Sequence, residues 1–185
     1  MTDIKTPHNP LYLREQSLRY SIELLFFAYR DFTAEADAML AGQGLGRAHH
    51  RVIYFVGANP GLPVSALLDI LKITKQSLSR VLSRLLEQGY IRQDRGSRDR
   101  RQRLLHLTDK GKALEAELTK AQRERFATAF KDAGMDAVDG FQTVLTYLVD
   151  QATRNQLRVP PGAGIIASKK PHAAGKPQRK RISAY

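Results

Sequence analysis

The sequence predicts a mainly α-helical fold with one small β-hairpin and with long helical arms at both ends. Apolar residues recur every three or four positions through most of residues 11–154, which is the period of an amphipathic helix. The period becomes an alternation only within residues 90–107, as in two short strands. Glycine and proline stand at several of the predicted boundaries, where helices usually end.

The first arm is a predicted helix over residues 11–40. Its apolar residues recur at spacings of three, four or seven, and Phe26 and Phe27 widen the apolar face. The glycines of AGQGLG are placed to end this helix. One small domain is too small to cover so long an apolar face, so the sequence predicts dimerisation through residues 11–46. The alternative is an ordinary intramolecular helix pair.

A helix-turn-helix pattern follows the first arm. RAHHRVIYFVG (47–57) predicts a helix, and NPGLP predicts a turn. Predicted helices over residues 64–71 and 75–88 are joined by three residues, which satisfies the helix-turn-helix pattern. Thr74 is placed to cap the second helix, and Gly89 stands where a left-handed residue would end it.

Beyond Gly89, YIRQDR and RQRLLHL predict two strands around the charged tip GSRDR. Thr108 begins a predicted helix that runs to about Lys131, and a last helix is predicted over residues 136–154. The remaining C-terminal residues are rich in Pro, Gly, Ala and Lys without periodicity, which predicts disorder. The predicted organisation is a flexible leader, an arm, a helix-turn-helix with hairpin, a second arm and a basic tail, at residues 1–10, 11–46, 47–108, 109–154 and 155–185.

The net charge of +12 is concentrated in two places. Residues 72–103 hold ten Lys/Arg and three Asp/Glu, and residues 151–185 hold eight Lys/Arg and no acidic residue. The rest of the chain is slightly acidic. A basic patch on an acidic body is typical of a surface that meets a polyanion, and the adjacent helix-turn-helix indicates double-stranded DNA.

The polar start of the helix over residues 75–88 predicts a recognition helix. Gln and Ser can hydrogen-bond base edges in the major groove, and Arg can bind guanine O6 and N7 together. The hairpin would be a wing whose tip arginines enter a minor groove. The predicted DNA-binding residues are Thr74, Lys75, Gln76, Ser77, Ser79, Arg80 and Arg84 in the helix, and Arg95, Arg98, Arg100 and Arg101 in the wing. Lys72 and Arg92 are further candidates for phosphate contacts.

Three motifs follow one another in order: Leu-x-x-Gly-x-Ile from Leu86, Asp99-Arg100-Arg101, and Leu-Thr-x-x-Gly from Leu107. With LLDILKITKQSLSRVLSRLLEQGYI, they resemble the winged helix-turn-helix of MarR-type transcriptional regulators over about residues 18–152. The resemblance implies a homodimer with interlaced terminal helices. Two such recognition helices would read a pseudo-palindrome with half-sites about one helical turn apart.

The resemblance also implies roles within the wing. Asp99 would brace Arg101 through a charge-assisted pair, while Arg98 and Arg100 would face DNA. Many family members carry a proline just before this motif, whereas this chain has Gly-Ser-Arg there. The tip is therefore expected to be more flexible, which leaves open which arginine reaches the groove.

Many MarR-type regulators release DNA when a small aromatic or phenolic effector binds between arm and winged domain. The candidate effector residues here are Tyr20, Phe27, His49, His50 and Tyr54, although aromatics at helical spacing are also typical of a core. Adjacent residues on a helix point about 100° apart, so the two histidines are not expected to chelate one metal ion. No metal site and no cofactor are predicted, since the chain also lacks cysteine.

Two other function classes compete with a transcriptional repressor. The basic tail favours an effector-independent architectural protein, because such a tail adds salt-dependent, sequence-independent affinity. An enzyme is not expected, because no Ser/His/Asp arrangement, phosphate loop or paired-carboxylate signature occurs. No run of 18 apolar residues is present, so a cytoplasmic, nucleoid-associated protein without a membrane partner is expected.

Overall fold

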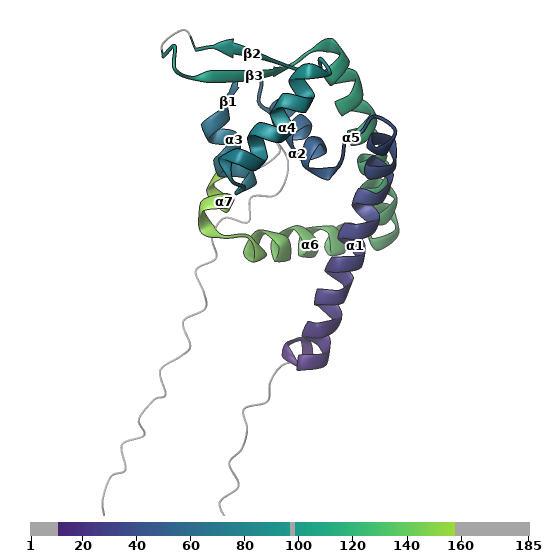
Figure 1. The fold of residues 1–185 in the computed structure, drawn as a ribbon. Helices are drawn as coiled ribbons and strands as arrows, with labels where there is room; N and C mark the ends of the chain where they lie inside the picture. The colour runs from purple at the N-terminus through teal and green to yellow at the C-terminus, as the bar shows by residue number, and fades with distance from the viewer. Residues whose placement is uncertain (1–10, 97–98, 158–185) are drawn as a thin grey trace, which may run out of the picture. The chain divides into compact units, whose positions relative to one another are not determined.

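The computed structural model describes residues 11–96 and 99–157 (Figure 1). The prediction of a mainly helical fold with a small sheet is confirmed. Residues up to Thr143 form one compact unit, and those from Val144 form a second. The elements are η1 (Leu11–Leu13), α1 (Glu15–Ala41), α2 (Arg47–Ala58), β1 (Leu62–Pro63), α3 (Val64–Leu71), α4 (Lys75–Glu87), β2 (Ile91–Arg95), β3 (Arg103–Leu107), α5 (Asp109–Ala133), α6 (Met135–Leu148) and α7 (Gln151–Gln156).

Helices α3 and α4 form the predicted helix-turn-helix because their leucines recur at helical spacing on one buried face. Leu78, Leu82 and Leu85 are the buried residues of α4. The turn uses a left-handed Lys72 with φ 49°, which redirects the chain without a glycine. The Thr74 hydroxyl then accepts a hydrogen bond from the Ser77 backbone N–H at 3.1 Å, so the predicted cap is present.

The sheet has three antiparallel strands in the order β1-β3-β2, so the predicted hairpin gains a third strand. β1 lies inside the segment predicted to be only a turn, and Leu62 pairs with Leu105 in the middle of β3. Gly61, with φ 81°, turns the chain toward the sheet and donates its backbone N–H to the Leu105 carbonyl at 2.9 Å. A two-residue strand has no period, so this pairing leaves no sequence signal.

The apolar core lies around α2. Val52, Ile53 and Val56 of α2 are fully or almost fully buried, and the same cluster includes leucines from α3, α4, β3 and α5. Gly57 lets α2 approach α5 closely, since an added Cβ would lie 3.2 Å from the Glu115 side chain. The core therefore holds the helix-turn-helix and the hairpin to one central helix.

The junction between β3 and α5 requires a glycine at position 111. The Thr108 backbone N–H donates to the Tyr90 carbonyl at 3.0 Å, and the Thr108 hydroxyl caps α5 by accepting from the Gly111 N–H at 3.1 Å. An added Cβ on Gly111 would lie 2.0 Å from the Tyr90 carbonyl oxygen. The Leu-Thr-x-x-Gly motif is thus a cap followed by a close backbone contact.

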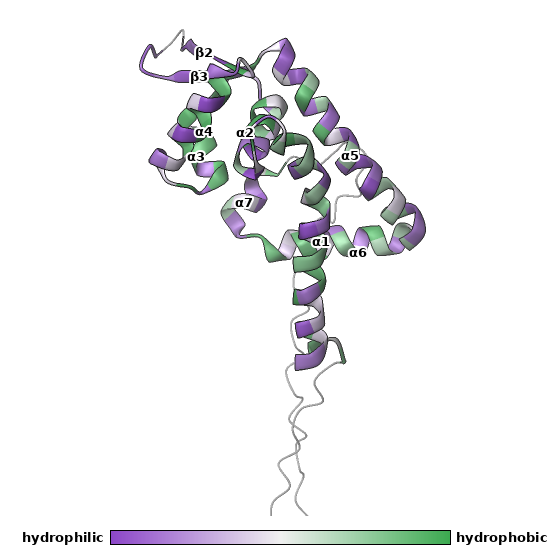
Figure 2. Cartoon of the chain, turned by 45° about the vertical axis from the view of Figure 1, so that its right-hand side comes forward, coloured by the Kyte–Doolittle hydropathy of each residue, from purple (hydrophilic) through white to green (hydrophobic). Residues whose placement is uncertain are grey.

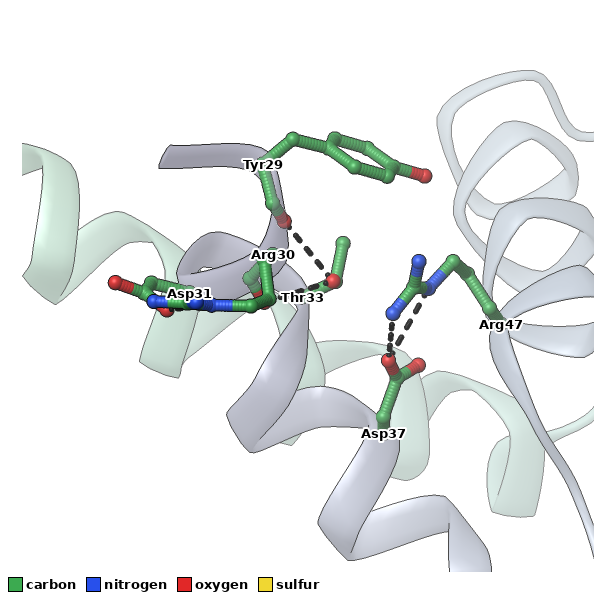
Figure 3. A network of polar contacts seen from close by, with 6 residues as sticks. All are labelled: Tyr29, Arg30, Asp31, Thr33, Asp37 and Arg47. Atoms are coloured by element: carbon green, nitrogen blue, oxygen red, sulfur yellow. Dashed lines mark hydrogen bonds and ion pairs between the residues drawn. The ribbon is translucent and has the colours of Figure 1, made fainter. Parts of the chain in front are cut away.

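A polar network joins α1 to the start of α2 (Figure 3). The Arg47 guanidinium donates to the Asp37 carboxylate, with an Nε–Oδ2 distance of 3.1 Å, and its carbon lies 5.3 Å from the centre of the Tyr29 ring. The Thr33 hydroxyl donates to the Tyr29 carbonyl at 2.9 Å within α1. Asp37 therefore balances a positive charge at the N-terminal end of α2, where a helix favours negative charge.

The arms leave much apolar surface exposed. Thr33, Ala36 and Leu40 are the buried residues of α1, and its N-terminal half extends away from α2–α5 (Figures 1 and 2). Near the middle of α1, Phe32 packs on Phe126 of α5 with ring centres 5.4 Å apart. Phe126 and Phe130 in turn meet Phe141 of α6, which joins the two arms within one chain.

The predicted final helix over residues 136–154 is wrong in one respect, because it is two helices. α6 ends at Leu148, and the Asp150 carboxylate accepts from the Thr153 N–H at 2.7 Å to begin α7. An extended Asp at this position competes with helix continuation. α7 reaches into the segment predicted to be a disordered tail. The leader 1–10 and the rest of the tail lie outside the described residues.

Gly111→Ala is expected to lower the free energy of unfolding by about 1–3 kcal/mol or more, because the methyl group has no room beside the Tyr90 carbonyl. Urea denaturation at one fixed protein concentration measures this. Gly42→Ala is the control, since Gly42 has helical backbone angles and an added Cβ there meets nothing within 4 Å. Equal midpoints for the wild type and Gly111→Ala would contradict the close-contact argument.

Candidate nucleic-acid interface

The solvent face of α4 carries the residues predicted to read DNA. All seven predicted residues of this helix and its cap are exposed, while the leucines of the opposite face hold the helix to the core. A shallow hollow on this face is lined by Lys75, Gln76, Ser79, Arg80, Ser83, Arg84 and Glu87. Ser83 was not among the predicted residues, although it follows Ser79 by one helical turn and therefore lies on the same face.

Two of the predicted reading residues are engaged in capping. The Thr74 hydroxyl accepts from the Ser77 N–H and donates to the Ser77 hydroxyl at 2.9 Å. Both side chains therefore stabilise the first turn of α4. The side chains left to face a ligand at this end are Lys75, Gln76, Ser79 and Arg80.

Arg84 lies differently from the other predicted residues. Its guanidinium reaches the loop between α1 and α2, where an added Cβ on Gly44 would lie 3.1 Å from Nη2. Gly44 has φ 66°, so glycine suits both the backbone and the arginine at this point. The Arg84 guanidinium thus lies near the α1–α2 loop, and the same residue also lines the hollow on α4.

The wing is a short basic hairpin. Arg95 of β2 lies opposite Arg103 of β3 in the strand register. The exposed arginines of the wing include Arg95, Arg100 and Arg101, while Arg98 lies outside the described residues. The outer part of the hairpin is hydrophilic (Figure 2). The Arg92 guanidinium contacts the Asp94 carboxylate, and His106 Nε2 lies 3.5 Å from the same carboxylate. Arg92 therefore has a partner within the wing, and its contact with a phosphate stays a prediction.

Asp99 braces the wing through the backbone. Its carboxylate accepts from the Arg101 backbone N–H at 2.9 Å, whereas the expected partner was the Arg101 side chain. The tip is closed by the Gln102 N–H donating to the Asp99 carbonyl at 3.0 Å and by the Gly96 N–H donating to the Gln102 carbonyl at 3.1 Å. Within the described residues the Arg101 guanidinium forms no ion pair. Its exposed side chain extends the basic surface.

Comparison with known proteins agrees with this arrangement of helix and wing. The sequence model of the MarR family matches residues 43–102. The HTH-type transcriptional regulator PetP of Rhodobacter capsulatus is 48% identical over 149 residues, which cover 80% of this chain and 90% of PetP. The chain belongs to the MarR family of transcriptional regulators. The family consists of regulators rather than enzymes, in agreement with the sequence prediction.

Solved MarR-type structures share the fold. FabT of Streptococcus pneumoniae, solved in complex with DNA, is 20% identical with a TM-score of 0.65, and the alignment covers 76% of this chain and 99% of FabT. MarR itself is 20% identical with a TM-score of 0.58, over 84% of this chain and 97% of MarR. A Listeria monocytogenes protein solved with a 26mer DNA is 20% identical with a TM-score of 0.61, over 69% and 85% of the two chains.

The effector residues predicted for this MarR-family chain do not gather in one place. Tyr20 and Phe27 lie on the exposed face of α1, with 63% and 53% of their surface accessible. Tyr20 precedes Asp37, which contacts α2, by about 25 Å along the helix axis. His49, His50 and Tyr54 lie on α2. Within one chain, the predicted pocket therefore divides into an α1 part and an α2 part.

Burial favours the neutral forms of the two histidines of α2. Burial lowers the pKa of His50, which is 7% exposed, although Asp37 and Glu115 act in the opposite direction. Burial also lowers the pKa of His49, and the charge of Arg84 acts in the same direction. His49 Nδ1 accepts from the Gly46 N–H at 3.1 Å, which requires an unprotonated Nδ1.

The sequence predicts neither a metal site nor a membrane partner. Within residues 11–96 and 99–157, no group of three or more His, Asp or Glu side chains is arranged to hold a metal ion. No helix in the same part of the chain has the length and apolar character needed to cross a membrane.

The stability of the protein is expected to fall as pH decreases from about 7.5 to 5.5. Both histidines have folded-state pKa values below 6.5, so the unfolded chain takes up protons first and the folded state loses free energy as the pH falls through 6.5. Urea midpoints across this range measure the effect. His50→Gln should flatten the dependence, whereas the exposed carboxylates with lowered pKa values titrate only at more acidic pH. An unchanged slope in His50→Gln would contradict the assignment to His50.

Proposed function

We propose that this chain is a sequence-specific DNA-binding repressor that acts as a homodimer on a pseudo-palindromic operator. The observation that carries the proposal is the exposed polar face of α4, which presents Lys75, Gln76, Ser79 and Arg80 from a helix anchored by buried leucines. A helix of this kind fits the major groove with its N-terminal residues at the base edges. Repression would follow because a dimer bound to its operator excludes other proteins from the same DNA.

The proposed contacts divide into two kinds. Arg80 and Gln76 have the chemistry for base edges, guanine and adenine respectively, and are the proposed source of sequence preference. Arg95, Arg100 and Arg101 of the wing are exposed and suit phosphates or a narrow minor groove. Two structural neighbours of the same fold were solved with DNA, which supports this use of the helix and the wing.

The proposed dimer rests on the exposed apolar surface of the arms. α6 buries no residue, and Met135 is 80% exposed. A large contiguous apolar surface that is exposed on a monomer is typical of a protein–protein interface. The exposed large apolar residues of α1 are Leu18, Tyr20, Ile22, Leu24, Leu25, Phe26, Phe27, Tyr29 and Met39.

A small aromatic effector is part of the proposal, with His49, His50 and Tyr54 of α2 as its nearest side chains. Neutral imidazoles and an exposed phenol ring offer both stacking and hydrogen bonding to such a molecule. Tyr20 of the same chain lies about 25 Å along α1 from Asp37, which contacts α2, so it is too far away to complete this site. Release of a bound operator duplex by small aromatic acids is the test for this part.

Selection of bound sequences from a random duplex pool at about 0.15 M salt tests the function. The expected result is a pseudo-palindrome with half-sites about ten base pairs apart. A featureless pool would overturn the operator proposal and favour the effector-independent architectural protein, for which the eight basic residues of 151–185 are the main argument.

Arg80→Ala is expected to weaken binding to the selected duplex by about 1–3 kcal/mol and binding to random duplex much less, because a base contact is lost. Arg123→Ala is the matched control, since it removes the same charge from an exposed position on α5. Titration of labelled duplexes measures both affinities. Equal losses on the two duplexes would show that Arg80 contacts phosphate rather than a base.

Phe26→Glu is expected to convert the protein from a dimer to a monomer. Phe26 is 69% exposed in one chain, so the charge is tolerated there, but it would be buried without a partner in the proposed interface. Ala116→Glu adds the same charge at an exposed position on α5 and should remain dimeric. Light scattering after size exclusion measures the mass. A wild-type mass near 20.8 kDa at micromolar concentration would contradict the dimer.

A further inference from the structure

We propose that Gln43, acting through Tyr90, is a positioning residue that sets the orientation of α4 and the wing for sequence-selective DNA binding. This inference rests on the proposed function, because it concerns how the recognition helix is held. Gln43 lies in the loop between α1 and α2, two residues beyond the end of α1. It lies within AGQGLG, where only the glycines were given a predicted role.

The loop that carries Gln43 is closely tied to the end of α1. The Gln43, Gly44 and Leu45 backbone N–H groups donate to carbonyls of the last turn of α1, at 3.0–3.1 Å. Gly44 has φ 66°, which reverses the chain at this point. At its other end, the Gly46 N–H is held by His49. A displacement of the C-terminal end of α1 therefore moves Gln43 with it.

Gln43 makes two hydrogen bonds to the segment that joins α4 to the wing. Its side-chain Oε1 accepts from the Tyr90 hydroxyl, and its backbone carbonyl accepts from Gln88 Nε2 at 3.2 Å. Arg84, one turn earlier on α4, approaches Gly44 of the same loop. The C-terminal end of the recognition helix is thus attached to the arm through three neighbouring positions.

Tyr90 is the residue at which α4, the wing and α5 meet. It is 6% exposed, and its backbone N–H donates to the Leu85 carbonyl of α4 at 2.9 Å. Its carbonyl accepts from the Thr108 N–H, and its ring lies 4.3 Å from the Lys110 ammonium. Lys110 also donates to the Gln88 carbonyl at 2.9 Å. The bond from Gln43 therefore acts on a point that is shared by both proposed DNA-contacting elements.

The geometry of α4 turns a small change at this end into a larger one at the reading end. Thirteen residues of helix span about 20 Å. A rotation of about 5° around the C-terminal end would move the N-terminal end by roughly 2 Å, which exceeds the tolerance of a hydrogen bond to a base. Loss of the Gln43–Tyr90 bond should therefore affect selectivity more than general affinity.

The side chains involved are suited to orientation rather than to core packing. Gln43 is exposed, so its replacement leaves the apolar core unchanged, whereas the Tyr90 ring stays packed when its hydroxyl is removed. A purely structural role predicts equal loss of binding to every duplex. A positioning role predicts loss of the preference for one sequence.

The test compares full-length wild type, Gln43→Ala, Tyr90→Phe and the double variant on the duplex selected by the wild type and on a random duplex of equal length. Each single variant should reduce the ratio of the two affinities by about 3- to 10-fold, the effect of one net hydrogen bond. The double variant should lose no more than the larger single loss, because both changes remove the same bond. Gln43→Glu keeps an acceptor and should restore most of the ratio.

Thr128→Val is the matched control, because it removes a hydroxyl, and its hydrogen bond to the Glu124 carbonyl, from an exposed position on α5. An unchanged affinity ratio in Tyr90→Phe, an equal loss on both duplexes, or additive losses in the double variant would overturn the positioning role. If the wild type shows no preference, the proposed function fails instead. Hydrogen exchange then decides the positioning role, since Gln43→Ala should speed exchange in the last turn of α4 and in β2, and unchanged exchange there would overturn it.

Discussion

The carbonyl oxygen of Tyr90 is the point on which the arrangement of α4, the wing and α5 depends. It accepts from Thr108, and the first turn of α5 lies so close to it that only glycine fits at position 111. Gly89, with φ 73°, turns the chain out of α4 just before it. The end of α4, the two strands of the wing and the start of α5 are thereby fixed within a few residues of one another. This constraint lets a hairpin of two five-residue strands stand at a defined place beside α4.

The apolar face of α4 packs into the core, and its polar face is open to solvent. Leu78, Leu82 and Leu85 anchor the helix in the core around α2, so the opposite face is held rigidly while it remains open to solvent. Side chains that are exposed on a rigid element suit recognition, because little conformational freedom of the backbone is lost on binding. The wing adds exposed arginines on a hairpin braced by the Asp99 turn. The match to the MarR-family model over residues 43–102 includes both α4 and β2.

Most of this arrangement could be predicted from the sequence, because its signals are local. The Thr74 cap, the turn at Gly89 and the alternating residues of β2 and β3 depend only on near neighbours. Features formed by distant residues left no such signal. β1 exists only through its pairing with β3, and the Gln43–Tyr90 bond joins residues 47 positions apart. The grouping of aromatic effector candidates took no account of the length of α1, which separates Tyr20 from the α2 residues within one chain.

In the contacts between α1 and the rest of the fold, stability and orientation come from different residues. Ala36 and Leu40 are fully buried where α1 meets the core, and apolar burial is strong but not directional. The Asp37–Arg47 pair is partly exposed, so solvent screens it and it weakens with salt. Hydrogen bonds such as that from Tyr90 to Gln43 add little net stability but constrain angle and distance. Changes at Ala36 or Leu40 should therefore be felt first as unfolding, and changes at the polar contacts first as altered orientation of α4. A regulator that transmits a signal from arm to helix needs the second kind of contact in addition to the first.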